Sequence, residues 1–286
     1  MKTTRRAFIK RSGTTLASAA LLSQVPLSLL TGCSGKEFSF GFQVWTIREK
    51  LFADFAGTLK AMSELGYSDV EMCSPLGYSG SGFEPLNKLS GSEMKQIIED
   101  NGLKCTSSHF TSGELNESLD NRIQWAQEIG MKQMILSSFW LAEDASVDDY
   151  RKAAENLNLM AERTKAAGIQ MGFHNHHMEF EKRGNELIYD ALLETLDPEL
   201  VKMQFQVAVV DIGYQAADYF RNNPGRFISA HLADYSPEKE SQVPIGEGMV
   251  DWPDFFKAAK VGGVKNFYVE MDPNTFEPSA EFLKKV

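Results

Sequence analysis

Short apolar runs alternate with amphipathic segments along most of this chain, and this alternation defines the expected fold. The apolar runs span 5–8 residues and are rich in Val, Ile, Phe and Met, which is typical of buried β-strands. Eight such strands are predicted, at Phe38–Trp45, Asp69–Cys73, Lys104–Phe110, Gln133–Ser138, Gln170–His176, Lys202–Val209, Phe227–Asp234 and Asn266–Asp272.

The segments between these strands carry apolar residues at helical spacing, as Phe55–Leu65 does. A glycine, which suits a left-handed helix end, stands between such a segment and the next strand at Gly66, Gly102, Gly130 and Gly168. Strands that alternate with helices pair in parallel, and eight units close a barrel. An open doubly wound sheet is the alternative, but it usually has a glycine-rich turn after its first strand, where this chain has no glycine. We therefore predict an α/β fold, a single (β/α)₈ TIM barrel.

The chain begins with the features of a secretory leader: positive residues, an apolar stretch, then small residues. Arg5 and Arg6 form a pair of the kind found in twin-arginine export signals. The stretch ends in Leu30-Thr31-Gly32-Cys33, which resembles a bacterial lipoprotein cleavage site with Cys33 as the lipidated residue. A membrane-spanning anchor is the alternative, but Pro26 and several serines interrupt a stretch shorter than the roughly 20 strongly apolar residues of a span.

These features divide the chain into three parts. We predict a signal peptide at 1–32, a short tether at 33–37 and the barrel at 38–286. The barrel would then have a typical length of about 250 residues. The expected location is the periplasmic side of a bacterial membrane. The lipid would be the only anchor, because no later segment is apolar enough to cross a bilayer.

Charge and cysteine content exclude some classes of protein. The net charge is −10, and loss of 1–32 removes five basic and no acidic residues, which gives −15. Nucleic-acid binding is strongly disfavoured as a function, because it depends on basic surfaces that neutralise phosphates. Cys73 and Cys105 both lie in apolar strand-like runs, so we expect two buried free thiols and no disulfide.

Polar side chains gather at the carboxyl ends of the predicted strands, where TIM barrels have their active sites. All five histidines lie at these ends: His109, His174, His176, His177 and His231. A single histidine is more often structural, but five at one rim favour a functional site. Imidazoles together with a carboxylate and one or two oxygen donors suit a divalent transition metal. The pattern therefore predicts a metal site at this end of the barrel.

Several motifs occur in order along the same strand ends: His174-Asn175-His176 with Glu179-Phe180, Arg226-Phe227 leading to His231-Leu232-Ala233-Asp234, Gly246-Glu247-Gly248 with Asp251-Trp252, and Val269-Glu270-Met271-Asp272. From about Phe40 to the C-terminus, the chain resembles the sugar phosphate isomerase/epimerase family of xylose isomerase-like TIM barrels. Each motif is short, so the resemblance rests on their shared order and strand positions.

The resemblance implies one divalent metal ion at the ends of strands five to eight. Matched by position, its ligands would be His174, Gln206, His231 and Glu270. The family often has glutamate in place of His174 and aspartate in place of Gln206, and both replacements here are neutral. Mn²⁺, Co²⁺ or Zn²⁺ would therefore be favoured over Mg²⁺, which prefers oxygen ligands. Ala233 replaces a lysine that is common in relatives, so any role of that lysine is missing.

The resemblance also implies proton abstraction next to a substrate carbonyl that the metal polarises. The predicted acid/base residues are Glu270, His176, His109 and Glu71. The predicted substrate-binding residues are Trp45, Gln43, Asn175 and Arg226. Glu179 and Asp234 are expected to orient imidazoles, or else to be ordinary helix-start and loop carboxylates.

The expected function is that of a metal-dependent isomerase or epimerase acting on a small, non-phosphorylated sugar or keto-sugar. One alternative is a lyase, hydratase or hydrolase of 3-keto-glycosides that uses the same enediolate chemistry. The other is a sugar-binding lipoprotein without catalytic activity. A phosphorylated substrate is disfavoured, because the loops after strands seven and eight are acidic at Glu247 and Asp272 and lack a glycine-rich anion site.

Overall fold

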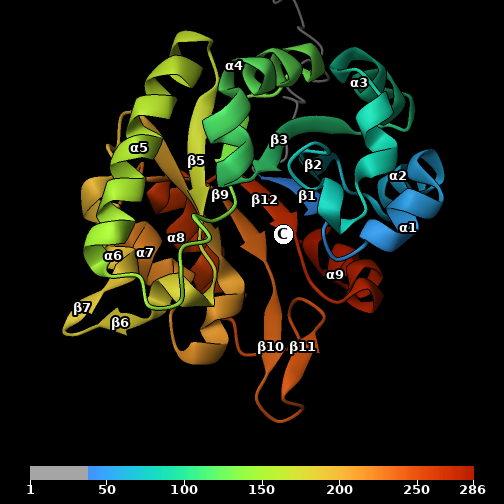
Figure 1. The fold of residues 1–286 in the computed structure, drawn as a ribbon. Coiled ribbons are helices and arrows are strands. Elements are labelled where there is room, and N and C mark those ends of the chain that lie inside the picture. The colour runs from blue at the N-terminus through green and yellow to red at the C-terminus, as the bar shows by residue number, and fades with distance from the viewer. Residues whose placement is uncertain (1–37) are drawn as a thin grey trace, which may run out of the picture. The chain divides into compact units, whose positions relative to one another are not determined.

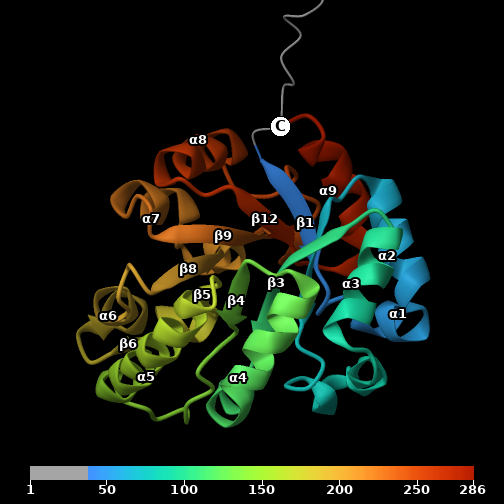
Figure 2. The same cartoon turned by 90° about the horizontal axis from the view of Figure 1, so that it is seen from above.

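Eight parallel strands close a barrel in the computed structural model, which describes residues 38–286 (Figures 1 and 2). The barrel strands are β1 (Ser39–Gln43), β2 (Asp69–Cys73), β3 (Lys104–Phe110), β4 (Gln133–Leu136), β5 (Gln170–His174), β8 (Val201–Gln206), β9 (Phe227–Leu232) and β12 (Asn266–Val269). Neighbouring strands follow one another along the chain, and β1 closes the ring against β12. The structure thus confirms the predicted fold and all eight predicted strands. The predicted leader, tether and lipidated Cys33 lie outside the described residues.

Helices surround the barrel, as the view from above shows (Figure 2). They are α1 (Arg48–Ala53), α2 (Phe55–Leu65), α3 (Gly91–Asp100), α4 (Ser112–Ile129), α5 (Val147–Ala166), α6 (Ile188–Thr195), α7 (Ala216–Asn222), α8 (Trp252–Gly262) and α9 (Phe276–Leu283). Helix α2 shows why they form: Asp54 caps its start by accepting from the Gly57 N–H at 2.9 Å, and Leu59 and Met62 are buried. Gly66 ends it with φ of 106°, and the other three predicted helix-ending glycines also have positive φ.

The side chains of each strand alternate between the helix layer and the barrel interior. On β8, Phe205 packs outward against Phe220 of α7, with ring centroids 6.0 Å apart. Burial of one such ring stabilises the fold by roughly 1.5–3 kcal/mol. Gln204, next in the strand, points inward and reaches Glu71 across the barrel. The interior is therefore polar towards the carboxyl ends of the strands, although the outer layer is apolar.

Two further expectations concern the thiols and the membrane. Cys73 and Cys105 are both buried and free, as predicted. Within residues 38–286, no helix combines the length and apolar character that a membrane span requires.

Some barrel strands end earlier than their apolar runs predict, because their last residues turn into the loops at the carboxyl end of the barrel. Strand β5 ends at His174, and a 3₁₀ turn follows at His177–Phe180. The Glu179 carboxylate accepts from the His176 backbone N–H at 2.7 Å, which takes that N–H away from strand pairing. A two-stranded hairpin, β10 (Asp234–Ser236) with β11 (Ser241–Val243), extends beyond this end of the barrel (Figure 1). A second small hairpin pairs β6 (Lys182–Arg183) with β7 (Glu186–Leu187).

Candidate active site

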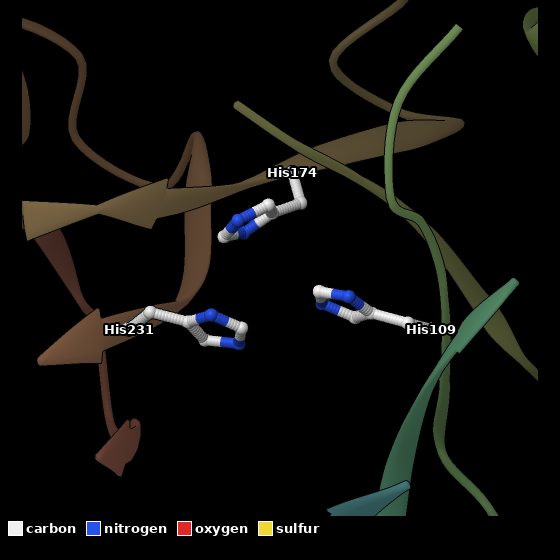
Figure 3. Close-up of side chains that lie close together, drawn as sticks. All are labelled: His109, His174 and His231. Atoms are coloured by element: carbon white, nitrogen blue, oxygen red, sulfur yellow. The ribbon is translucent and has the colours of Figure 1, made fainter. Parts of the chain in front are cut away.

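Three histidines from different strands point toward one another inside the barrel (Figure 3). They are His109 of β3, His174 of β5 and His231 of β9, and all three are buried. The ring centroid of His174 lies 4.9 Å from that of His109 and 4.4 Å from that of His231. One ligand nitrogen from each ring lies within 4.8 Å of the other two. These three buried imidazoles could bind a metal ion.

Two carboxylates hold His231 from opposite sides. Its Nδ1 lies 2.9 Å from Oε2 of Glu270, and its Nε2 hydrogen-bonds to Oε2 of Glu71. Burial alone would lower the pKa of His231, but Glu71 and Glu270 raise it to about 9. Burial alone would raise the pKa of each carboxyl, but the histidines beside them hold both below their usual values. Without a bound ion, the His231 ring is therefore a cation, protonated on both nitrogens, between two ionised carboxylates.

Glu71 is fully buried in the barrel interior, where its carboxylate contacts polar side chains of neighbouring and opposite strands. Its Oε1 accepts from Oγ of Ser107 at 2.6 Å and from Nε2 of Gln204 at 2.8 Å. Its Oε2 lies 3.2 Å from Nε2 of His109, which also hydrogen-bonds to Oε1 of Gln204 at 2.8 Å. Gln204 was assigned no role from the sequence. Its period-two spacing from Gln206, which places both side chains on one face of β8, was the available signal.

One nitrogen without a hydrogen-bond partner indicates that the three histidines fit a metal ion. Nδ1 of His174 is buried and has no hydrogen-bond partner among the described residues. A buried polar atom without a partner is costly, so its position favours a ligand at this point. Burial, together with the neighbouring His231, lowers the pKa of His174, which keeps the ring neutral and its lone pair free. Imidazole ligands suit transition-metal ions such as zinc.

The four residues predicted as metal ligands meet at this point, although Gln206 makes an unexpected contact. Its amide NH₂ donates to Oε2 of Glu270 at 2.7 Å, and its Oε1 accepts from the Ala208 N–H at 3.2 Å. In this arrangement Gln206 orients Glu270 and turns its oxygen away from the histidines. The third imidazole of the group is His109, which the sequence analysis had selected as an acid/base residue.

His176 lies at the mouth of the site and is half-buried. Its ring centroid is 4.9 Å from that of His174 and 5.7 Å from that of the exposed Trp140. Burial lowers the pKa of His176 to about 4, although Glu270 opposes the shift, so the ring is neutral at pH 7. The carboxyl group of Glu179, whose pKa burial raises to about 7, binds the main chain of His176 and not its imidazole.

Three residues predicted to bind substrate lie near this end of the barrel. Trp45 follows β1 and is half-buried. Gln43 is fully buried, donates to Sγ of Cys73 at 3.2 Å and accepts from the Trp45 N–H. Asn175 is also buried, and its Oδ1 accepts from the Gln206 backbone N–H at 3.1 Å. Trp45 is therefore the one of the three that retains exposed surface.

Arg226 and Asp234 do not have the surroundings that their predicted roles require. Arg226 precedes β9, at the opposite end of the barrel, and donates to the carbonyls of Val201 and Leu196 at 2.5 and 2.6 Å. It fastens the starts of two strands, so we remove it from the candidate substrate site. Asp234 orients none of the imidazoles among residues 38–286, which agrees with the alternative prediction of a loop carboxylate. Its carboxylate accepts instead from the loop N–H of Gly246 at 3.0 Å and from three further main-chain and indole donors between residues 248 and 252.

Comparisons with known proteins agree with this architecture. Residues 59–286 match the family described as xylose isomerase-like TIM barrel. A sugar phosphate isomerase/epimerase from Parabacteroides distasonis is 23% identical with a TM-score of 0.71, over 91% of this chain and 98% of that one. The IOLI protein with a bound zinc atom is 14% identical (TM-score 0.61; 86% and 95% covered), and an L-ribulose 3-epimerase is 14% identical (TM-score 0.62; 86% and 93% covered). A search of curated proteins gave no match. The chain belongs to the family of xylose isomerase-like TIM barrels.

Proposed function

We propose that this protein is a metal-dependent enzyme of the isomerase/epimerase type that removes a proton next to the carbonyl of a non-phosphorylated sugar or keto-sugar. The observation that carries the proposal is the group of three buried histidines beside Glu270, whose side chain is 14% exposed. Glu270 is the carboxylate of this group that has access to the mouth, because Glu71 is fully buried. The fold shared with a sugar phosphate isomerase/epimerase and an L-ribulose 3-epimerase supports a small carbohydrate as substrate.

The residues that would hold the ion are His174, His231 and Glu270, with His109 completing the set. Gln206, which was predicted as a ligand, orients Glu270 instead, since its oxygen accepts from the Ala208 N–H. Nitrogen donors favour Mn²⁺, Co²⁺ or Zn²⁺ over Mg²⁺. When bound, the ion would supply a Lewis acid that polarises a substrate carbonyl.

Glu270 is suited to accept the substrate proton. Its pKa lies below the usual value, so it is ionised at neutral pH, and the Gln206 amide and the His231 ring fix its Oε2. The neutral imidazole of His176 is the second group at the mouth, and its Nδ1 has no hydrogen-bond partner among residues 38–286. One carboxylate and one imidazole thus form the proposed acid/base pair.

The pairing of a carboxylate with an imidazole also supports a second candidate function. Epimerases that use two opposed bases take a proton from one face and return it on the other, and Glu71 is too deeply buried to be a second accessible carboxylate. Elimination from a 3-keto-glycoside needs one base and one group that passes a proton to the leaving oxygen. Glu270 and His176 match these two tasks.

The charge of the loops at the carboxyl end of the barrel favours a substrate without phosphate. The phosphate site of many TIM barrels is formed after strands seven and eight. Here the loops after those strands carry Glu247 and Asp272, both exposed, which would repel a phosphate.

We also propose, from the leader alone, that the mature protein is exported and anchored by a lipid at Cys33 on the periplasmic side of the membrane.

Hydrogen exchange tests the proposed function directly. Protein from residue 34 onward, loaded with Mn²⁺, Co²⁺ or Zn²⁺ in D₂O, is incubated with a free ketohexose or a methyl 3-keto-glucoside. We expect NMR to show deuterium at the carbon next to the carbonyl, and methanol release would identify elimination. A protein that binds the ion and the sugar but exchanges no proton would contradict the proposal and favour a sugar-binding lipoprotein.

Trp140 offers a separate prediction about binding. It is 59% exposed, its backbone has φ of 50°, and its ring lies beside that of His176. An exposed tryptophan in a left-handed conformation is characteristic of a functional position, and its ring can stack on the apolar face of a sugar. We expect Trp140→Ala to raise KM about two- to tenfold with little change in kcat, because an aromatic contact contributes roughly 0.5–1.5 kcal/mol. Leu159→Ala, at an equally exposed position on α5, is the control and should leave KM unchanged.

A further inference from the structure

Both oxygens of the Glu71 carboxylate are surrounded by hydrogen-bond donors of the protein, whereas an acid/base group needs an oxygen that a substrate can reach. Each of its oxygens faces two donor groups: Oε1 faces Ser107 and Gln204, and Oε2 faces Nε2 of His231 and, at 3.2 Å, Nε2 of His109. A carboxylate offers about four lone-pair positions, so Glu71 has none left for a substrate. With its side chain fully buried, it acts on the protein itself.

The contact with Glu71 decides how His231 can bind an ion. An ionised carboxylate only accepts hydrogen bonds, so the Nε2 facing it must carry a proton. The other nitrogen, Nδ1, then faces Oε2 of Glu270 at 2.9 Å, on the side of the mouth. An imidazole whose Nε2 is fixed in this way presents Nδ1 as the ligand atom, and such carboxylate–histidine pairs are common behind metal ions.

We propose that Glu71 is a positioning residue, which holds His231 through Nε2 so that Nδ1 is presented to the metal ion together with Glu270. This inference rests on the proposed function for the existence of the ion, but it assigns Glu71 a role different from the acid/base role that its strand-end position suggests.

Gln204 links the Glu71 carboxylate to His109 and to Ser229. Its NH₂ donates to Glu71 and, at 3.0 Å, to Oγ of Ser229, while its Oε1 accepts from His109. Because one side of the amide binds the carboxylate and the other binds an imidazole, Glu71 is held in place independently of any ion. Removing one member of such a buried, paired network leaves its partners without hydrogen bonds, so the network holds Glu71 in one position.

Zinc affinity tests the proposal through the matched variants Glu71→Gln and Glu114→Gln. Both replace a buried carboxylate with an amide, but Glu114 lies in α4, where its carboxylate binds the side chains of Ser74 and Arg122. In competition with a chelator, we expect Glu71→Gln to bind Zn²⁺ about 10- to 100-fold more weakly than the wild type. Glu114→Gln should remain within about threefold, since it leaves every residue around His231 unchanged. Equal affinity of the wild type and Glu71→Gln would overturn the proposal.

A second variant and a spectroscopic readout cover the case in which Glu71→Gln does not fold. Ser107→Ala removes one donor to the same carboxylate, and we expect a smaller loss of affinity in the same direction. In ¹⁵N-histidine NMR of the zinc-loaded wild type, we expect His231, identified by its loss in His231→Ala, to carry its proton on Nε2. A proton on Nδ1 would overturn the proposal.

Failure of the proposed function gives a different result. If the wild type binds no zinc, the metal-free spectrum still reports on Glu71. Loss of a slowly exchanging Nε2–H signal of His231 in Ser107→Ala or Glu71→Gln would then support the positioning role, and its persistence in both would overturn it.

Discussion

Glu270→Gln is expected to lower turnover about 10²- to 10⁴-fold, the range that positioned acid/base groups contribute. Glutamine keeps the size of the side chain but cannot accept a substrate proton at neutral pH. The substitution also removes the negative charge of the carboxylate, whose Oε2 faces Nδ1 of His231 and accepts from the Gln206 amide. Deuterium exchange into the keto-sugar probe, measured at saturating metal, separates the loss of the base from weaker metal binding.

The control for this variant is Glu277→Gln on the outer face of α9. Glu277 is exposed and lies outside the histidine group, so the variant should exchange deuterium at the wild-type rate. Exchange by Glu270→Gln within about tenfold of the wild type would mean that another group takes the proton. His176 would then be the first candidate, since its neutral ring lies at the mouth.

His231→Ala is expected to destabilise the metal-free protein by about 3–5 kcal/mol. The reason is that His231 is fully buried and pairs with the fully buried Glu71 and with Glu270, whose side chain is 14% exposed, so its removal leaves both carboxylates without this partner. Urea unfolding in the presence of a chelator measures the change in the free energy of unfolding and keeps metal binding out of the comparison.

His177→Ala is the matched control, because the same substitution is made at a histidine close to the site. His177 pairs with Asp211 at 2.9 Å, but its side chain is 48% exposed. An exposed polar contact of this kind contributes at most about 1 kcal/mol, so the free energy of unfolding should change little. Equal destabilisation by the two substitutions would show that the Glu71–His231–Glu270 contacts do not stabilise the fold.

The fold could be predicted from the sequence because two independent local signals agree. Apolar runs of strand length give the eight barrel strands, and glycines such as Gly66 end the helices between them with positive φ. The carboxyl ends of the strands were less predictable. His176 belongs to the apolar run of β5, but the side chain of Glu179, three residues later, binds its N–H and ends the pairing. This is a side-chain contact that periodicity does not encode.

The location of the site was predictable, whereas individual roles were not. TIM barrel geometry places strand ends together, which brings His109, His174 and His231 to one point. Arg226 is adjacent to β9 in sequence but at its opposite end, so proximity to a motif was misleading. Gln204 was assigned no role because its importance comes from a contact across the barrel to Glu71, between residues far apart in sequence.

Metal content is the measurement that tests the central claim most directly. The domain from residue 34 onward is purified, incubated with Mn²⁺, Co²⁺ or Zn²⁺, desalted and analysed by elemental mass spectrometry beside His231→Ala and Glu270→Gln. We predict about one equivalent of one of these ions in the wild type and a clear loss in both variants. A wild-type protein that retains no metal after incubation with each ion would contradict the account and leave a sugar-binding barrel as the better explanation of the site.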